Sequence, residues 1–187
     1  MSKSVMMNDE TVEEASSGAN MSDVFVYGTL MSPDVFEAVI GRKPTYACTK
    51  AVLRSEEYTR CACTDGRVYP ALVPVRRDSS TTSTAPVHGR VITGLSARDH
   101  IILDAFEDEY EKVLLHVTCF DEDGTAATTT RACLTYVYRR VEPWCTDSPW
   151  NYDEFVRLHL DAYLEGCAEF KLEIEEELAR LRGDNDI

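Results

Sequence analysis

Several carboxylates and two aromatic rings crowd the segment 103–111, with sequence LDAFEDEYE. Glu107 directly follows Phe106. A glutamate held against an aromatic ring and partly removed from water has a raised pKa, which a general base working near neutral pH requires. Glu107 is therefore the candidate catalytic base. A solvated acidic turn would carry the same residues, and the local sequence does not reject that alternative.

The second candidate is the segment Tyr27–Ser32, which joins an expected strand to an expected helix. Gly28 lets backbone approach a ligand closely because it has no side chain. A helix start offers unpaired N–H groups and the positive end of the helix dipole. Such a junction binds carboxylates or stabilises an oxyanion. An ordinary strand-to-helix turn is typical of the same pattern.

The sequence gives little support for other common catalytic, metal-binding or cofactor-binding sites. Tyr69 offers a hydroxyl, but the prolines beside it indicate a sheet edge or bulge. None of the four histidines forms a pair spaced for a metal on one helix, and Cys61 and Cys63 alternate as packing residues on a strand do. Nucleophile elbow, phosphate-loop and dinucleotide motifs are absent from the sequence. We expect no metal site and no organic cofactor.

These candidates need elements to position them. The pattern predicts a strand at 24–27, a helix from Ser32-Pro33 to Ile40 that Gly41 ends, and short strands between 45 and 76. It then predicts a strand at 87–95, a helix at 96–106 with Ser96 as its N-cap, and strands at 110–120 and 132–138 that the turn 121–124 joins. Strands and helices do not alternate regularly, which favours an α+β fold over a doubly wound sheet.

The C-terminal region predicts one long helix. Apolar residues recur at steps of three and four from Val156 to Leu181, which indicates a face directed at the core. The expected organisation is a disordered N-terminal extension at 1–22, one domain at 23–182 and a tail at 183–187. The Ser/Thr-rich stretch 77–86 predicts an exposed loop.

Composition limits the partners. The chain has 187 residues and a formal net charge of −14, which would repel nucleic acid and anionic membrane surfaces. Apolar runs stay well short of the roughly 20 residues of a membrane span, and a signal peptide is not indicated. The seven cysteines show no framework spacing. They predict reduced thiols and a cytoplasmic location. The oligomeric state is not predicted.

The ordered span, about residues 23 to 172, resembles the gamma-glutamylcyclotransferase-like family, and most closely its plant avirulence-induced-gene-like branch. Each motif is moderately specific, and five in the right order are strong evidence. The matching segments are 25–30 (FVYGTL), 68–71 (VYPA), 87–95 (VHGRVITGL), 103–110 (LDAFEDEY), and 150–155 (WNYDEF) with His159-Leu160.

The resemblance implies a small curled, barrel-like mixed sheet with flanking helices and a long C-terminal helix. It implies a metal-independent acyltransferase or lyase that cyclises a small-molecule gamma-glutamyl amide to 5-oxoproline and releases an amine. Glu107 would be the proton acceptor. The substrate-binding residues would be Phe25, Val26, Tyr27, Gly28, Thr29 and Leu30, with Tyr69, Tyr110 and Tyr138 as further pocket candidates.

Two other functions stay open. The fold could serve as a non-catalytic small-molecule-binding or regulatory module, or the acidic C-terminal helix could dock a partner protein. The loop 77–86 is longer than the family pattern, which leaves the substrate undecided, and the N-terminal extension is not part of the family core.

Overall fold

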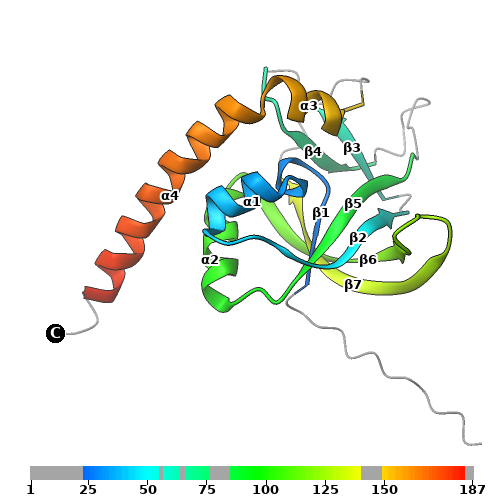
Figure 1. Cartoon of the computed structure of the whole chain (residues 1–187), viewed down its shortest axis with the longest axis horizontal. Helices are drawn as coiled ribbons and strands as arrows, with labels where there is room; N and C mark the ends of the chain where they lie inside the picture. The colour runs from blue at the N-terminus through cyan, green and yellow to red at the C-terminus, as the bar shows by residue number, and fades with distance from the viewer. Residues whose placement is uncertain (1–22, 55–56, 64–65, 76–84, 140–148, 184–187) are drawn as a thin grey trace, which may run out of the picture.

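The computed structural model describes residues 23–54, 57–63, 66–75, 85–139 and 149–183. The predicted N-terminal extension, most of the 77–86 loop and residues 184–187 lie outside these ranges, so the predictions for them stay predictions. The fold is α+β, as the sequence predicts, with helices gathered on one side of a barrel (Figure 1).

Five strands close into the barrel. Their spatial order is β1-β5-β2-β6-β7, and every pair is antiparallel except the parallel closure of β1 onto β7. Because a closed barrel has no free edge, all its strands are paired on both sides. The strands are β1 (Val24–Val26), β2 (Thr45–Leu53), β5 (Val87–Thr93), β6 (Tyr110–Phe120) and β7 (Ala127–Tyr138).

A separate hairpin stands beside the barrel. Strands β3 (Tyr58–Ala62) and β4 (Pro70–Pro74) pair antiparallel. They are two of the short strands predicted between 45 and 76. The carbonyl of Val68, just before β4, accepts a hydrogen bond of 2.8 Å from the indole of Trp150, which ties the hairpin to the chain entering the C-terminal helices.

Two predicted helices begin at the predicted caps. In α1 (Pro33–Ile40) the Ser32 hydroxyl accepts from an N–H of the first turn, and Gly41 ends the helix with φ +94°. In α2 (Ala97–Phe106) Ser96 and Asp99 form a complete capping box. These contacts satisfy N–H groups that every helix start leaves unpaired. A short 3-10 turn, η1 (Thr29–Met31), precedes α1 and was not predicted.

The C-terminal region contains the predicted long helix, but a separate short helix precedes it. It forms α3 (Tyr152–Leu158) and α4 (Leu160–Gly183), and the direction changes at His159, whose φ/ψ of −127°/−15° is not helical. The change lets the buried Phe155 ring meet Tyr163 edge to face, with 5.3 Å between centroids. Packing across the bend, which a periodic pattern does not report, decided the break. The α4 helix then packs along α1 and α2 (Figure 1).

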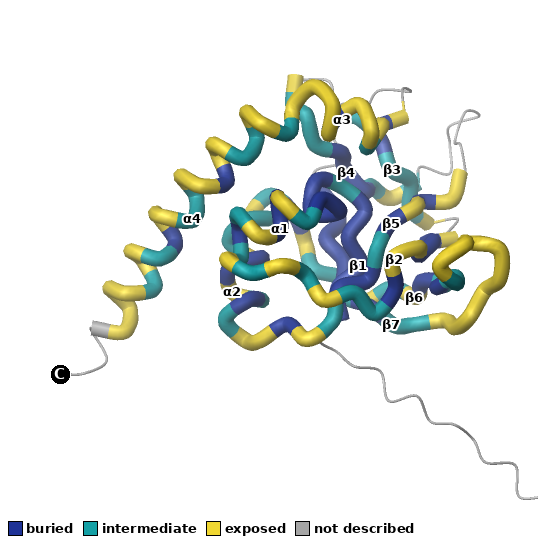
Figure 2. Tube along the Cα trace, in the orientation of Figure 1, coloured by how far each residue is buried: buried dark blue, intermediate teal, exposed yellow. Residues whose placement is uncertain are grey.

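Burial is concentrated in β1 and the elements around it (Figure 2). All three residues of β1 are buried, whereas one face of α4 stays exposed along its length. Among helices in the described ranges, none has the length and apolar character that crossing a bilayer requires.

One prediction about the cysteines is wrong. Five of them, Cys48, Cys63, Cys119, Cys133 and Cys167, carry free thiols. Cys61 is disulfide-bonded. The prediction that all thiols are reduced is wrong at this position. Spacing along the chain does not show which cysteines a fold brings within bonding distance.

Candidate active site

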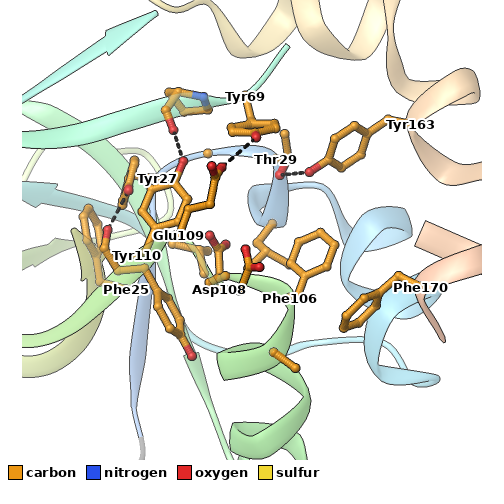
Figure 3. Close-up of a pocket in the computed structure, with 17 residues that line it drawn as sticks. Phe25, Tyr27, Thr29, Tyr69, Phe106, Asp108, Glu109, Tyr110, Tyr163 and Phe170 are labelled. Carbon is orange, nitrogen blue, oxygen red and sulfur yellow. Dashed lines mark hydrogen bonds between the residues drawn. The ribbon is translucent and has the colours of Figure 1, made fainter. Parts of the chain in front are cut away.

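A cavity of about 330 Å³ lies where β1 runs into η1 and α2 runs into β6. The segments 25–30 and 105–110 form two of its walls, and Tyr69 with Pro70 forms a third. Tyr136, Tyr163 and Phe170 complete it (Figure 3). Two distant parts of the sequence, both singled out by their residue types, therefore meet at one hollow.

Glu107 occupies the C-cap of α2 and lines this cavity. Its backbone is fixed on both sides, because its N–H donates to Leu103 at 2.9 Å and its carbonyl accepts from Tyr110 at 2.9 Å. Burial, reinforced by the negative charge of Asp108, raises the pKa of Glu107 to about 8. The carboxyl group therefore titrates near neutral pH, where a general base is most effective.

The tyrosine hydroxyls around Glu107 are bound elsewhere. Tyr27 donates to the carbonyl of Tyr136 at 2.6 Å, and Tyr110 donates to the carbonyl of Pro70 at 2.9 Å. Tyr136 donates to Asp104 at 2.8 Å. Among the described residues, none donates a hydrogen bond to the Glu107 carboxyl. The group is left unpaired inside the cavity and is free to accept a proton from a ligand.

Glu109, two residues further on, has the opposite environment. It forms an ion pair with Arg67 and accepts a hydrogen bond of 3.1 Å from the Tyr69 hydroxyl. Burial, followed by the charge of Glu109, raises the pKa of Tyr69 to about 12, so Tyr69 stays a donor. The Arg67 guanidinium also lies 5.6 Å from the centre of the Tyr69 ring. Glu109 therefore has its charge compensated, and Glu107 does not.

The segment from Tyr27 to Leu30 lines the same cavity. The 3-10 turn uses the N–H groups of Met31 and Ser32, which bond to the carbonyls of Gly28 and Thr29 at 3.0 and 2.9 Å. The described residues provide no hydrogen-bond acceptor for the N–H groups of Gly28, Thr29 and Leu30. Three successive unpaired N–H groups make an anion-binding concavity.

Gly28 is required here for space. A Cβ at this position would lie 3.0 and 3.1 Å from two ring carbons of Pro70. The glycine thus brings the β4 wall close to the loop. Arg60 supports the loop from behind, because it donates to the carbonyls of Tyr27 at 2.9 Å and His88 at 3.3 Å.

The α4 helix supplies a wall that the motifs do not reveal. The Thr29 hydroxyl donates to the Tyr163 hydroxyl at 3.3 Å. The Phe170 ring meets Phe106 edge to face at 5.2 Å. Figure 3 shows Tyr163 and Phe170 approaching the cavity from the side opposite Tyr110. The C-terminal helix therefore closes the hollow with two aromatic side chains.

The structure brings most of the predicted site residues together. The six residues of the 25–30 loop, Glu107, Tyr69 and Tyr110 all line the cavity. Tyr138 does not; it is buried, with its ring 5.3 Å from the ring of Tyr110. Sequence reasoning missed Tyr163 and Phe170, which lie on the periodic apolar face of the last helix. That pattern shows a buried face without showing which of its residues border a cavity.

Within the described ranges, no group of three or more His, Cys, Asp and Glu side chains is arranged to hold a metal ion.

Two plant proteins are similar to this chain in sequence. AIG2-like protein D of Arabidopsis thaliana is 32% identical over 155 residues, which cover 82% of this chain and 91% of that protein. AIG2-like protein A of the same plant is 29% identical over 152 residues, covering 81% and 82%.

Two solution structures of Arabidopsis thaliana proteins share the fold. One has a TM-score of 0.54 and 30% identity, covering 81% of this chain and 91% of the other. The second has a TM-score of 0.52 and 26% identity, covering 82% and 83%.

Residues 24–154 match the family described as "Gamma-glutamyl cyclotransferase, AIG2-like". This match spans both the 25–30 loop and Glu107, and it takes in every strand of the barrel. The chain therefore belongs to the AIG2-like gamma-glutamyl cyclotransferase family.

Proposed function

We propose that this protein is a gamma-glutamylcyclotransferase that converts a gamma-glutamyl amide to 5-oxoproline and releases an amine. One observation carries the proposal. An unpaired carboxyl group with a pKa of about 8 shares a cavity with three unpaired backbone N–H groups. A proton acceptor and an anion-binding concavity are the two features that this cyclisation needs.

The reaction is intramolecular. The α-amino nitrogen of the substrate attacks its own γ-carbonyl carbon, a new C–N bond closes the five-membered lactam, and the C–N bond to the leaving amine breaks. Because the nucleophile is tethered to the carbonyl, the protein needs mainly to hold the reactive conformer. A cavity of about 330 Å³ lies within the range of small-molecule sites.

Glu107 handles the proton. A free α-amino group has a pKa of roughly 8, so it is mostly protonated at neutral pH. That value is close to the pKa of Glu107, and a proton can pass from the ammonium group to the carboxylate with little energetic cost. The carboxylic acid then gives this proton to the departing nitrogen, which leaves as a neutral amine. The carboxylate takes the second proton from the new ring nitrogen and passes it to water, which leaves a neutral lactam.

The N–H groups of Gly28, Thr29 and Leu30 stabilise negative charge on the substrate. They meet either the oxygen of the γ-carbonyl, where charge builds during attack, or the α-carboxylate of the substrate. Both assignments place the reacting atoms in the same cavity as Glu107. Tyr69, Phe106, Tyr163 and Phe170 enclose the site with aromatic surface, which limits the entry of water.

The test is product formation from a panel of gamma-glutamyl amino acids and gamma-glutamyl amines, with 5-oxoproline measured by mass spectrometry. Wild-type protein is expected to release it, and Glu107→Gln is expected not to. Asp108→Asn is the matched control, because Asp108 is an exposed carboxylate beside the same cavity.

Release by both wild type and Glu107→Gln would keep the reaction and remove Glu107 from the role of base. If no member of the panel gave product but several raised the melting temperature, the protein would be a binding module on this fold.

A further inference from the structure

A second cavity, of about 460 Å³, lies on the barrel where β2 and β5 run side by side. Residues 49–52 and Arg54 come from β2 and its end, and residues 88–90 come from β5. Phe120 and Gly124 of the β6–β7 hairpin and Met31 of η1 complete the lining. We call it the basic cleft, because Lys50, Arg54, His88 and Arg90 line it.

The charge of this cleft opposes that of the whole protein. The chain carries a net charge of −14, yet none of the residues that line the cleft is acidic. Elsewhere in the described ranges, six basic side chains form ion pairs with carboxylates. Within the same ranges, no carboxylate contacts the side chains of Lys50, Arg54 or His88. Like charges gathered without counter-charges repel each other unless an anion joins them.

One acidic side chain of the hairpin, Asp121, already has hydrogen-bond partners in its own turn. The carboxylate of Asp121 accepts hydrogen bonds from the N–H of Thr125 at 2.8 Å, the hydroxyl of Thr125 at 3.2 Å and the N–H of Ala126 at 3.3 Å. These contacts direct the Asp121 carboxylate toward its own loop. Asp121 therefore shapes the turn that ends at the cleft and does not neutralise the basic groups.

A β-bulge directs Lys50 into the cleft. The register of β2 against β5 shifts between Cys48 and Ala51, which leaves Thr49 and Lys50 without partners in that ladder. The buried Cys48 thiol donates to the carbonyl of Lys50 at 2.8 Å and contacts the carbonyl of Phe120 at 3.7 Å. Bulges re-aim side chains and are frequent beside functional sites. This one is held by a contact that also joins the hairpin.

Two aromatic rings hold Arg90 in place. Its guanidinium lies 5.5 Å from the centre of the Tyr46 ring and 5.9 Å from that of Tyr152, and it donates to the Tyr46 hydroxyl at 3.3 Å. Aromatic faces attract a cation but do not neutralise it. The half-buried Arg90 is therefore a pre-oriented donor, of the type that binds phosphate and carboxylate groups through two parallel N–H bonds.

The base of the cleft is apolar. Met31, Ala51 and Val52 are buried, and Phe120 is partly exposed. Basic side chains around an apolar base fit a molecule that has one anionic end and one apolar body. The size falls within the range of small-molecule sites, and the net charge of the protein opposes binding of a long polyanion.

We propose that the basic cleft is a second ligand site, which binds a small organic anion through a phosphate or carboxylate group and an apolar or aromatic body. The proposal does not depend on the reaction at Glu107. Leu30 lines the first cavity and the next residue, Met31, lines the cleft, so the two sites are separate but share the segment after β1.

The test is a titration of the full ¹⁵N-labelled chain followed by NMR amide shifts. Phenyl phosphate and benzoate are the anionic probes, and benzyl alcohol is the neutral probe of similar shape. We expect saturable shifts at residues 49–52, 88–90, 120 and 124 with an anionic probe and much smaller shifts with benzyl alcohol. Which of the two anionic probes binds more tightly identifies the preferred anionic group. Affinity should fall as salt is raised.

Two double variants sharpen the result. Lys50→Gln/Arg54→Gln should weaken binding of the better probe by at least about 10-fold, since two charge-assisted contacts are lost. Lys43→Gln/Arg157→Gln removes the same charge from exposed positions that do not line the cleft, and should leave the affinity within about 2-fold of wild type.

The proposal is overturned if both double variants lose affinity equally, since net charge alone would then explain binding. It is also overturned if the shifts spread over basic residues outside the cleft, if they centre on residues 28–30 and 107, or if no probe gives saturable shifts at millimolar concentration.

Discussion

Among the described residues, the two cavities leave opposite charges unpaired, and burial decides what each charge does. In the first cavity the Glu107 carboxyl is removed from water, so its pKa rises to about 8 and it can exchange a proton near neutral pH. In the basic cleft Lys50 and Arg54 are exposed, and no carboxylate of the described residues contacts them. A buried unpaired charge suits proton transfer, whereas exposed unpaired charges suit attraction of an ion. The same barrel thus holds both proposed sites, one for catalysis and one for binding.

The largest expected effect is on turnover. Glu107→Gln should lower kcat by about 10²-fold or more, because the amide cannot accept the proton of the substrate. Asp108→Asn should keep kcat within a few-fold of wild type, since Asp108 acts on Glu107 only through its charge. Steady-state kinetics with the best substrate measure both. Equal losses in the two variants would show that overall negative charge, and not a base at Glu107, drives the reaction.

The next effect concerns the donor loop. Gly28→Val should raise KM or lower kcat by about 10-fold or more, because side-chain atoms at this position press on the Pro70 ring and displace the N–H groups by part of an ångström. Gly166→Ala in α4 is the control, since a Cβ there meets nothing within 4 Å. Unchanged kinetics in Gly28→Val would show that the loop does not hold the substrate.

The pH dependence of kcat/KM tests how burial affects Glu107. Because Glu107 must be ionised to act as base, kcat/KM should rise with pH, reach half its limiting value near pH 8 and level off above it. The charge of Asp108 contributes to the raised pKa of Glu107, so Asp108→Asn should move the rising limb to lower pH by a few tenths of a unit. If the rising part of the pH profile stays at the same pH in this variant, the ionisation that it reports belongs to a group other than Glu107.

Mutations in the two cavities should also differ in their effect on the free energy of unfolding. The folded protein holds the Glu107 proton up to about pH 8, whereas the unfolded chain releases it near its ordinary value of 4.5. Ionisation therefore costs the native state increasing free energy as pH rises through this window. Glu107→Gln should gain stability over wild type, on the order of 1 to 4 kcal/mol at pH 8.5, with a smaller gain at pH 5.

The smallest expected effect is at the cleft. Lys50→Gln/Arg54→Gln should change the free energy of unfolding by less than about 0.5 kcal/mol at either pH, because both side chains are exposed. Urea unfolding at pH 5 and pH 8.5 measures all these variants. An equal gain at both pH values in Glu107→Gln would contradict the assigned pKa, and a large loss in the double variant would make the cleft a structural feature.

The sequence by itself determined the local parts of this protein. Ser32 and Ser96 begin the helices that they were expected to begin, and Gly41 ends α1, because caps depend on groups within a few residues. The motifs around Gly28 and Glu107 likewise located the loop and the carboxyl group that share the cavity.

Only the tertiary structure decided which distant residues meet. It placed Tyr163 and Phe170 at the cavity and kept Tyr138 in the core, although all three lie in apolar or alternating patterns that predict burial alone. It also paired Arg67 with Glu109 and left Glu107 unpaired. Periodicity reports which face of an element is buried, but the identity of the neighbour depends on how the chain closes over long separations. For that reason the charge of each cavity, and with it the chemistry, appears only in the folded protein.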